Sequence, residues 1–295
     1  MSGSRVLPLT RAEIDLSPLD LDLTLGCGQT FRWRRRADGS WSGPLGKDII
    51  TLKGSGRKLL VDGKGDGSHL AAAVRTYLRA GDDVGAIQRA LGKDPVLSPG
   101  IHGLRGLRIV KMDEWECLVS YVLATYANIP RIARMIDALS RRYGTPIDGD
   151  TYSFPAPKAV RRATVAELRR CGLGYRAKYV RAVGQAVNED RIRELRRRRY
   201  PELREELKSL PGVGDKVADC VCLFGFGRLE AFPIDVWMER ALARLYGQTG
   251  SYAKLRTFAA SRFGRHAGYA QEYMYHNERT RARGGACAFS EQAQD

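Results

Sequence analysis

The sequence predicts an α+β fold, in which a small N-terminal antiparallel β-sheet domain precedes a larger helical domain. Apolar and polar residues alternate between residues 19 and 61, and turn-forming pairs separate the alternating runs, as is typical of strands. From about residue 70 onward, apolar residues instead recur at helical spacing in successive segments. We place the first domain, with a helical connection at its end, at residues 1–105 and the second at residues 106–295.

The expected sheet depends on two alternating runs and the turns beside them. Leu19–Leu23 alternates leucine with aspartate, and Thr30–Arg34 alternates aromatic with polar residues. Asp38–Gly39 and Lys64–Gly67 are turn signals that lie between or after strands. These segments together predict an antiparallel sheet near the N-terminus.

The expected helices follow from Leu70 to the end of the chain. Trp115–Leu123 carries an apolar helical face, and Ile132–Leu139 continues the pattern. Thr164 and Glu167 have the spacing of a capping box at the start of a further helix. Another helix is expected to begin at Tyr200 and to lead into a glycine-containing turn.

The chain is strongly basic. It has 295 residues, enough for a substantial core, and its 49 Lys and Arg against 33 Asp and Glu give a formal net charge of +16. Such an excess favours a polyanionic partner and says nothing about sequence preference. Arg196–Arg199 is either a nuclear-localisation patch or a solvated helix end, and we favour the second interpretation.

Cysteine spacing and hydropathy exclude several classes of protein. The six cysteines, at positions 27, 117, 171, 220, 222 and 287, form no Cys-x-x-Cys pair, so neither a zinc site nor a thioredoxin-like site is expected. Only Cys287 lies near the C-terminus, which leaves no four-cysteine iron–sulfur loop. No run is long enough to span a membrane, and the first thirty residues contain no signal-peptide core. We therefore expect a soluble intracellular protein with reduced thiols, in the cytoplasm and nucleoid or in the nucleus depending on the organism.

Leu210–Cys220 carries the main functional signal. Gly212 and Gly214 allow a sharp turn and a close approach of a ligand, and an apolar run beginning at Lys216 predicts a helix directly afterwards. A helix N-terminus that follows such a turn binds anions, and in a basic protein the expected anion is a DNA phosphate. Taken alone, the turn is equally well explained as a simple connection between two helices.

A second signal lies nineteen residues after the lysine, at Asp235. This aspartate follows a proline at the start of another predicted helix, so capping of that helix is its alternative role. The two roles are compatible, because a capping carboxylate is held ionised and oriented. Asp219 lies one turn after Lys216, and we expect it to be solvated or to cap. Turn, lysine and aspartate together resemble the helix-hairpin-helix DNA glycosylases.

The chemistry of base removal explains these residue types. Breaking an N-glycosidic bond places positive charge on the deoxyribose, and a neutral amine can attack C1′ and form a Schiff base with the opened sugar. Such an amine is kept neutral by desolvation or by nearby positive charge. Lys216 at the positive end of a helix meets this requirement. Asp235 is the candidate that would stabilise the developing cation.

Four separated blocks sharpen the resemblance, and they extend over nearly the whole chain. They are Gly-Gln-Thr-Phe-Arg-Trp at 28–33, Gly-Leu-Gly-Tyr-Arg-Ala-Lys-Tyr at 172–179, the hairpin through residue 235, and Ala-Gly-Tyr-Ala-Gln at 267–271 followed by a tyrosine at 275. In this order the blocks resemble the 8-oxoguanine DNA glycosylase/lyases of the eukaryotic-type branch. The resemblance implies that the second domain is an all-helical helix-hairpin-helix glycosylase domain.

The resemblance also implies which residues contact the damaged base. Oxidation at C8 turns guanine N7 from a hydrogen-bond acceptor into a donor, and the family assigns a carbonyl at the position of Gly28 to this N–H. Gln271 would contact the Watson–Crick edge of the flipped base, and Tyr275 would stack on it where the family commonly has phenylalanine. Core packing is the alternative role of Tyr275. We include Cys220 in the same pocket, although burial in the core explains it, with Cys222, equally well.

Contacts to the rest of the duplex are implied in the same way. Gly212, Gly214 and Val217 would bind a phosphate through their N–H groups, and Arg176 would reach the estranged cytosine beside a wedging Tyr175. A surface arginine in a glycine-rich turn is the alternative for Arg176.

Two positions depart from the family pattern. Where the family has an asparagine-rich loop that fills the gap left by the flipped base, this chain has Tyr126 with Asn128, which makes cytosine selectivity doubtful. Trp237 replaces the usual histidine two residues after the aspartate, so one DNA contact differs.

The sequence thus predicts a bifunctional DNA glycosylase and AP lyase that acts on duplex DNA containing 8-oxoguanine. We expect a monomer that needs no organic cofactor and no catalytic metal, with a monovalent cation on hairpin carbonyls as an option that the resemblance suggests. Two alternatives remain at this stage. One is an alkylpurine DNA glycosylase, which lacks the lysine nucleophile, and the other is a non-catalytic helix-hairpin-helix protein that binds damaged DNA.

Overall fold

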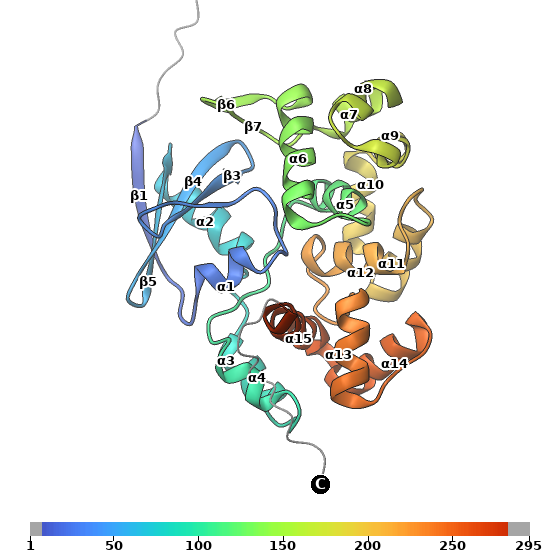
Figure 1. Cartoon of the computed structure of the whole chain (residues 1–295). Coiled ribbons are helices and arrows are strands. Elements are labelled where there is room, and N and C mark those ends of the chain that lie inside the picture. The colour runs from blue at the N-terminus through green and yellow to red at the C-terminus, as the bar shows by residue number, and fades with distance from the viewer. Residues whose placement is uncertain (1–7, 283–295) are drawn as a thin grey trace, which may run out of the picture.

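A computed structural model of the chain describes residues 8–282 and confirms the predicted fold class (Figure 1). A five-stranded antiparallel sheet has the order β1-β5-β4-β3-β2 and is followed by helix α2. The bounds of this part are β1 Leu9–Asp15, α1 Leu21–Gly26, β2 Arg34–Arg35, β3 Trp41–Leu45, β4 Asp48–Ser55, β5 Lys58–Lys64 and α2 Gly67–Tyr77.

The local structure around Leu19–Leu23 differs from the prediction. This run was expected to be a strand, but it enters helix α1, because the Asp20 side chain accepts a hydrogen bond of 2.9 Å from the Leu23 N–H. Alternation of leucine with aspartate therefore reflects a helix cap and not a sheet face. The strand that pairs with β5 instead is β1, Leu9–Asp15, which sequence analysis did not identify. Of the second run, Thr30–Arg34, only its last residue belongs to a strand, β2.

The remainder is mainly helical. Its helices are α3 Val84–Leu91, α4 Ser98–His102, α5 Glu114–Leu123, α6 Ile129–Tyr143, α7 Pro157–Arg162, α8 Val165–Arg170, α9 Ala177–Ala186, α10 Glu189–Arg197, α11 Tyr200–Lys208, α12 Asp215–Phe224, α13 Val236–Tyr246, α14 Tyr252–Phe263 and α15 Ala267–Ala282. Short 3-10 turns precede α9 and α15. A two-stranded hairpin, β6 Pro146–Asp148 with β7 Thr151–Tyr152, interrupts the helices. The predicted capping box of Thr164 and Glu167 is confirmed at the start of α8.

One buried core extends from the sheet through the helices, from Ile14 to Met274. In Figure 1 the sheet and α2 lie on one side, the helices α7–α14 lie on the other, and α15 lies between them. Helix α15 packs against both α13 and α4, so it joins the last part of the chain to the segment that follows the sheet. The domain division at residue 105 falls in the connection between α4 and α5 and stays a prediction.

Several other expectations fall on buried side chains. Asp219 was expected to be solvated or to cap, which is wrong: its side chain is fully buried and hydrogen-bonded. The five cysteines of the described residues are buried and unpaired, and Cys287 lies outside them. In the same part of the chain, no helix is both long and apolar enough to cross a membrane.

Candidate active site

The hairpin between α11 and α12 forms a tight turn with open N–H groups. The Val213 N–H closes the turn on the Leu210 carbonyl at 3.1 Å. Gly212 has φ +83°, and a Cβ there would lie 2.6 Å from the Tyr179 ring, so this position requires glycine. No side chain caps α12, and among residues 8–282 the N–H groups of Lys216 and Val217 find no acceptor. These donors are therefore free for an anion.

Lys216 lies in the first turn of α12 and is partly buried. Its Nζ is 5.4 Å from the ring centroid of Tyr121, a buried residue of α5. The Tyr121 hydroxyl donates to the Gln29 carbonyl at 3.1 Å, and its ring stacks on Phe224 with centroids 5.5 Å apart. The amine therefore lies against an immobilised aromatic wall and not in bulk solvent.

Asp235 begins helix α13 and caps it, as predicted. Its Oδ1 accepts a hydrogen bond of 3.0 Å from the Met238 N–H. Burial raises the pKa of the Cys220 thiol to about 12, an effect that positive Lys216 opposes and negative Asp235 reinforces. Lys216 and Asp235 therefore both act on the electrostatics of the buried Cys220 thiol.

The loop around Gly28 is held by a residue that sequence analysis missed, Gln29. Its Nε2 donates to the carbonyls of Thr24 and Arg108 at 2.7 and 2.8 Å, and its Oε1 accepts from the Val110 N–H at 2.9 Å. The amide is buried and uses both of its polar atoms. Gln29 therefore fixes the Gly28 backbone. The only sequence signal for Gln29 was its place in the block at residues 28–33. Glutamines are mostly exposed, so burial was not expected.

Gly28 itself has a conformation and surroundings that demand glycine. Its φ is +106°, and a Cβ would lie 2.5 Å from Ile129 Cδ1 and 2.9 Å from Arg279 Nη1. The Arg279 guanidinium also donates to the Cys27 carbonyl, next to Gly28. The backbone at Gly28 is partly exposed, so a ligand can reach it.

Helix α15 carries Gln271 and Tyr275 one turn apart, as predicted. Gln271 is buried, and its Oε1 has no hydrogen-bond partner among the described residues. Burial and negative Asp235 raise the pKa of Tyr275, which places this tyrosine near the carboxylate that caps α13. Helix α15 therefore carries a buried acceptor without a partner in the described residues and, one turn later, an aromatic side chain that Asp235 influences electrostatically.

Glu272 is a second residue that sequence analysis missed. It is 2 % exposed, and burial raises its pKa to about 7, with Asp235 reinforcing the shift while Cys27 and Arg279 oppose it. The Cys27 thiol donates to the Thr24 carbonyl at 3.4 Å, and Glu272 Oε1 has no hydrogen-bond partner in the described residues. Charged residues on helices are mostly solvated, so the sequence offered no sign of this buried acid.

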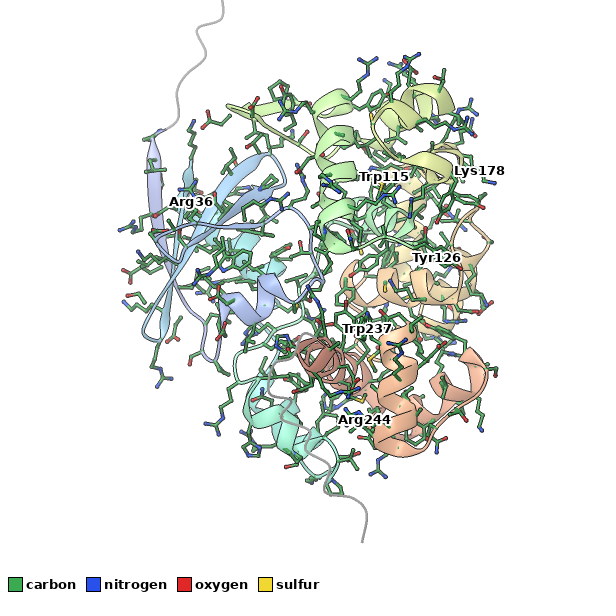
Figure 2. All side chains as sticks on the ribbon, in the orientation of Figure 1. Arg36, Trp115, Tyr126, Lys178, Trp237 and Arg244 are labelled. Carbon is green, nitrogen blue, oxygen red and sulfur yellow. The ribbon has the colours of Figure 1, made fainter. Side chains whose placement is uncertain are left out.

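The loop between α5 and α6 presents Tyr126 to solvent. Tyr126 is 96 % exposed at φ +50° and is labelled in Figure 2. Asn128 caps α6, because its Oδ1 accepts from the Arg131 N–H at 3.0 Å. The Tyr175 hydroxyl donates to the Thr125 carbonyl at 3.2 Å from the neighbouring turn.

Arg176 holds this loop from beneath. The interpretation of Arg176 as a surface arginine is wrong, because the side chain is 1 % exposed. Its guanidinium donates to the Thr125 carbonyl at 2.9 Å and to the Tyr126 carbonyl at 3.0 Å. Trp237 (Figure 2), by contrast, is partly exposed at the start of α13. The guanidinium carbon of Arg240 lies 5.4 Å from the centre of its ring.

Comparisons with known proteins agree with this geometry. The family model for the N-terminal domain of 8-oxoguanine DNA glycosylase matches residues 11–118, and that for HhH-GPD superfamily base excision DNA repair proteins matches residues 119–263. A probable N-glycosylase/DNA lyase of Methanothermobacter thermautotrophicus is 32% identical over 63% of this chain and 68% of its own length. The chain belongs to the 8-oxoguanine DNA glycosylase family.

Further members of this family match along most of the chain. The N-glycosylase/DNA lyase of Arabidopsis thaliana is 29% identical over 91% of this chain and 78% of its own length. The 8-oxoguanine glycosylase/lyase of Clostridium acetobutylicum, solved with duplex DNA that has cytosine opposite 8-oxoguanine, superposes with a TM-score of 0.84 at 28% identity, covering 90% of this chain and 93% of that one. The family assignment therefore favours the predicted function over either alternative class.

Gly28→Ala should both destabilise the glycosylase and weaken base excision. Two costs add at this position, the positive φ and the overlap with Ile129. Gly46→Ala is the matched control, since Gly46 has φ +64° with open space around it. In urea unfolding we expect Gly46→Ala to lose about 1 kcal/mol with unchanged excision, and Gly28→Ala to lose more and to excise at least about tenfold more slowly. Equal effects of the two changes would contradict the assigned role of the Gly28 loop.

Glu272→Gln should change how the stability of this glycosylase depends on pH. The usual pKa of 4.5 rises to about 7 on folding, so between these values the folded chain holds one more proton than the unfolded chain. Raising the pH through this range therefore destabilises the wild type, by up to about 3 kcal/mol, and spares the variant.

Urea unfolding from about pH 5 to pH 8 measures this difference in the free energy of unfolding. The free energy of unfolding of Glu272→Gln minus that of the wild type should increase as the pH rises. The exposed Glu239→Gln should follow the wild type throughout. A gap that stays constant over the range would contradict the raised pKa.

Proposed function

We propose that this chain removes 8-oxoguanine from duplex DNA and then cleaves the strand, with Lys216 as nucleophile and Asp235 as the carboxylate that stabilises charge. The carrying observation is the partly buried Lys216 amine, 5.4 Å from the Tyr121 ring, at the start of a helix whose first N–H groups have no acceptor in the described residues. Lesion-containing DNA bound to the Clostridium acetobutylicum relative supports the choice of substrate.

The proposed reaction uses the amine as the nucleophile and the carboxylate as the group that stabilises positive charge. The Lys216 nitrogen uses its lone pair to bond C1′, and the glycosidic bond breaks with its electron pair going to the departing base, which takes up a proton. Asp235 stabilises the positive charge that develops on the sugar. Opening of the ring gives a Schiff base, and loss of a C2′ proton to water then expels the 3′ phosphate.

Recognition of the lesion is assigned to backbone and helix α15. The Gly28 carbonyl would accept a hydrogen bond from the N7–H that only the oxidised base has. The bonds of Gln29 hold this carbonyl in place. Normal guanine has no N7–H, so it would leave the fixed acceptor unpaired. The free Oε1 of Gln271 is suited to accept from the N–H groups of the Watson–Crick edge. Tyr275 would stack on the base.

Binding of the phosphate backbone is assigned to the hairpin. The unpaired N–H groups of Lys216 and Val217, with those of Gly212 and Gly214, would bind one phosphate at the start of α12. In the described residues the carbonyls of Ser209, Pro211 and Val213 accept no hydrogen bond, which suits a monovalent cation. Such a cation would lower the repulsion between bound phosphate and free carbonyls.

The opposite strand is assigned to the loop of Tyr126 and the turn below it. Tyr126 is exposed and aromatic and would enter the gap left by the flipped base, with Asn128, Tyr175, Arg176 and Trp237 contacting the duplex nearby.

We further propose that the enzyme acts as a monomer and needs no organic cofactor.

Lys216→Gln should abolish covalent trapping on DNA. When sodium borohydride is added during reaction with an 8-oxoguanine duplex, only a Schiff base between protein and sugar is reduced to a stable adduct. Lys178→Gln is the matched control, because Lys178 also lies over a tyrosine ring, at 4.8 Å, and is not a proposed nucleophile. We expect no adduct for the first variant, a wild-type adduct for the second, and duplex binding in both. An adduct that persists in Lys216→Gln would assign the nucleophile elsewhere.

Tyr126→Asn should alter the preference for the base opposite the lesion. The position has φ +50°, which asparagine tolerates well, so the change removes the ring without straining the loop. Excision opposite each of the four bases, measured under single-turnover conditions, should show a changed ranking or spread. Tyr126→Phe keeps the ring and should keep the wild-type profile; an unchanged profile in Tyr126→Asn would remove the gap-filling role.

A further inference from the structure

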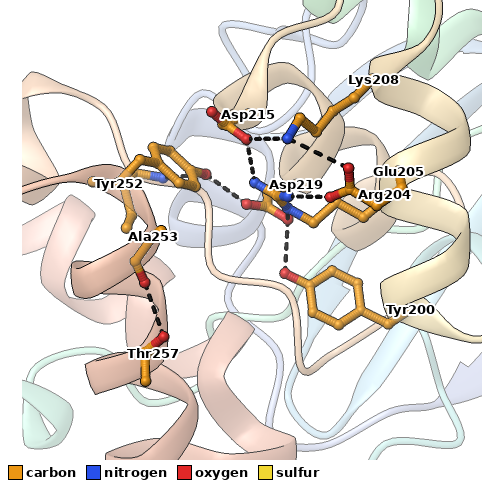
Figure 3. A network of polar contacts seen from close by, with 10 residues as sticks. Tyr200, Arg204, Glu205, Lys208, Asp215, Asp219, Tyr252, Ala253 and Thr257 are labelled. Atoms are coloured by element: carbon orange, nitrogen blue, oxygen red, sulfur yellow. Dashed lines mark hydrogen bonds and ion pairs between the residues drawn. The ribbon is translucent and has the colours of Figure 1, made fainter.

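A buried polar cluster joins helices α11, α12 and α14, and α12 also carries the proposed nucleophile Lys216 (Figure 3). At its centre is Asp219, fully buried one turn after Lys216 on α12. Its Oδ1 accepts from the Tyr200 hydroxyl at 2.7 Å and from Arg204 Nε at 3.0 Å, and its Oδ2 accepts from the Tyr252 hydroxyl at 2.6 Å. We call Tyr200, Arg204, Asp219 and Tyr252 the Asp219 cluster.

Charge balance within the Asp219 cluster keeps the carboxylate in place. Arg204 also donates to Asp215 Oδ1 at 2.6 Å, so one guanidinium joins two carboxylates on either side of Lys216 in the sequence. Its guanidinium carbon lies 5.7 Å from the centre of the Tyr252 ring. A buried carboxylate with three donors is costly to disturb, so α12 has a fixed position relative to α11 and α14.

The Tyr252 hydroxyl makes a second contact that leads to the other catalytic residue. The Ile234 N–H donates to this oxygen at 3.2 Å, and Ile234 directly precedes Asp235. A tyrosine hydroxyl has one hydrogen to donate and lone pairs to accept with, so both bonds form at once. Burial and the neighbouring Asp219 raise the pKa of Tyr252, so the hydroxyl keeps its proton over the working pH range.

One oxygen atom therefore bridges two segments. On one side it is bonded to α12, a turn away from the amine, and on the other it is bonded to the backbone that enters α13. The entering segment, residues 231–235, has no regular structure of its own. Its position at Ile234 depends on the hydroxyl of α14.

We propose that Tyr252 is a positioning residue for this reaction, and that its hydroxyl sets the separation between the Lys216 amine and the Asp235 carboxylate. The inference rests on the proposed function of those two groups. Its physical reason is that the carboxylate must lie beside the sugar at the moment the amine attacks. Small displacements of a positioned catalytic group cost large factors in rate.

Tyr252→Phe tests the proposal, because it removes the bridging oxygen and keeps the ring over Arg204. Single-turnover excision of 8-oxoguanine should fall about tenfold or more. Trapping by borohydride on a duplex with a preformed abasic site should fall less than about threefold, because attack on the open aldehyde needs no stabilisation of a sugar cation. The dissociation constant for a duplex with a non-hydrolysable lesion analogue should stay within about twofold.

Tyr246→Phe is the matched control. Tyr246 also donates to a carboxylate, Asp94 Oδ2, at 3.2 Å, yet its hydroxyl has no contact with Ile234 or α12 in the described residues. Tyr252→Phe should lose more thermal stability than the control, because it unpairs two buried groups, and the control should excise like the wild type. Exchange of the Ile234 amide hydrogen, followed by NMR, should accelerate in Tyr252→Phe more than exchange of other buried amides, and should stay unchanged in Tyr246→Phe.

The outcomes separate this inference from the proposed function. Equal excision rates in the two variants, or an equal loss of excision and of abasic-site trapping in Tyr252→Phe, would overturn the positioning role while the wild type remains an active glycosylase. A wild-type chain that neither excises 8-oxoguanine nor is trapped would contradict the proposed function, and this inference with it.

Discussion

The contact between the Lys216 amine and the Tyr121 ring joins parts of the chain that are far apart in sequence. Tyr121 is held by the Gln29 carbonyl and by Phe224, so the aromatic wall depends on the loop after α1, on α5 and on α12. The amine reaches that wall because the glycine turn aims the first turn of α12 toward it. Packing among these three segments thus fixes the position of the Lys216 amine, the proposed nucleophile.

Burial of polar groups accompanies this arrangement throughout the site. Gln29 and Asp219 are buried with their hydrogen-bonding capacity used, whereas Gln271 and Glu272 each keep an oxygen without a partner in the described residues. The first pair makes the scaffold rigid, because breaking such bonds leaves unpaired groups in a poorly solvated place. The second pair leaves two buried oxygens on α15 without a hydrogen-bond partner in the described residues.

Local signals explain how much could be predicted from the sequence. The hairpin, the cap at Asp235 and the capping box of α8 depend on a few adjacent residues, and the structure has all three. The helix at Leu21–Gly26 was mistaken for a strand because leucine–aspartate alternation looks the same until the Asp20 cap is seen. Roles that depend on distant partners, such as those of Asp219 and Glu272, had no local signal. Their neighbours come from other helices.

The position of Arg176 has an energetic consequence for how the undamaged strand is read. Its guanidinium is already bonded to the carbonyls of Thr125 and Tyr126. To engage a nucleobase across from the lesion, it must exchange these partners, and each surrendered bond subtracts about 1 kcal/mol from what the new contact supplies. A contact from Arg176 would therefore contribute little to selecting the base opposite the lesion. The remaining preference would depend on the shape of the exposed loop that carries Tyr126.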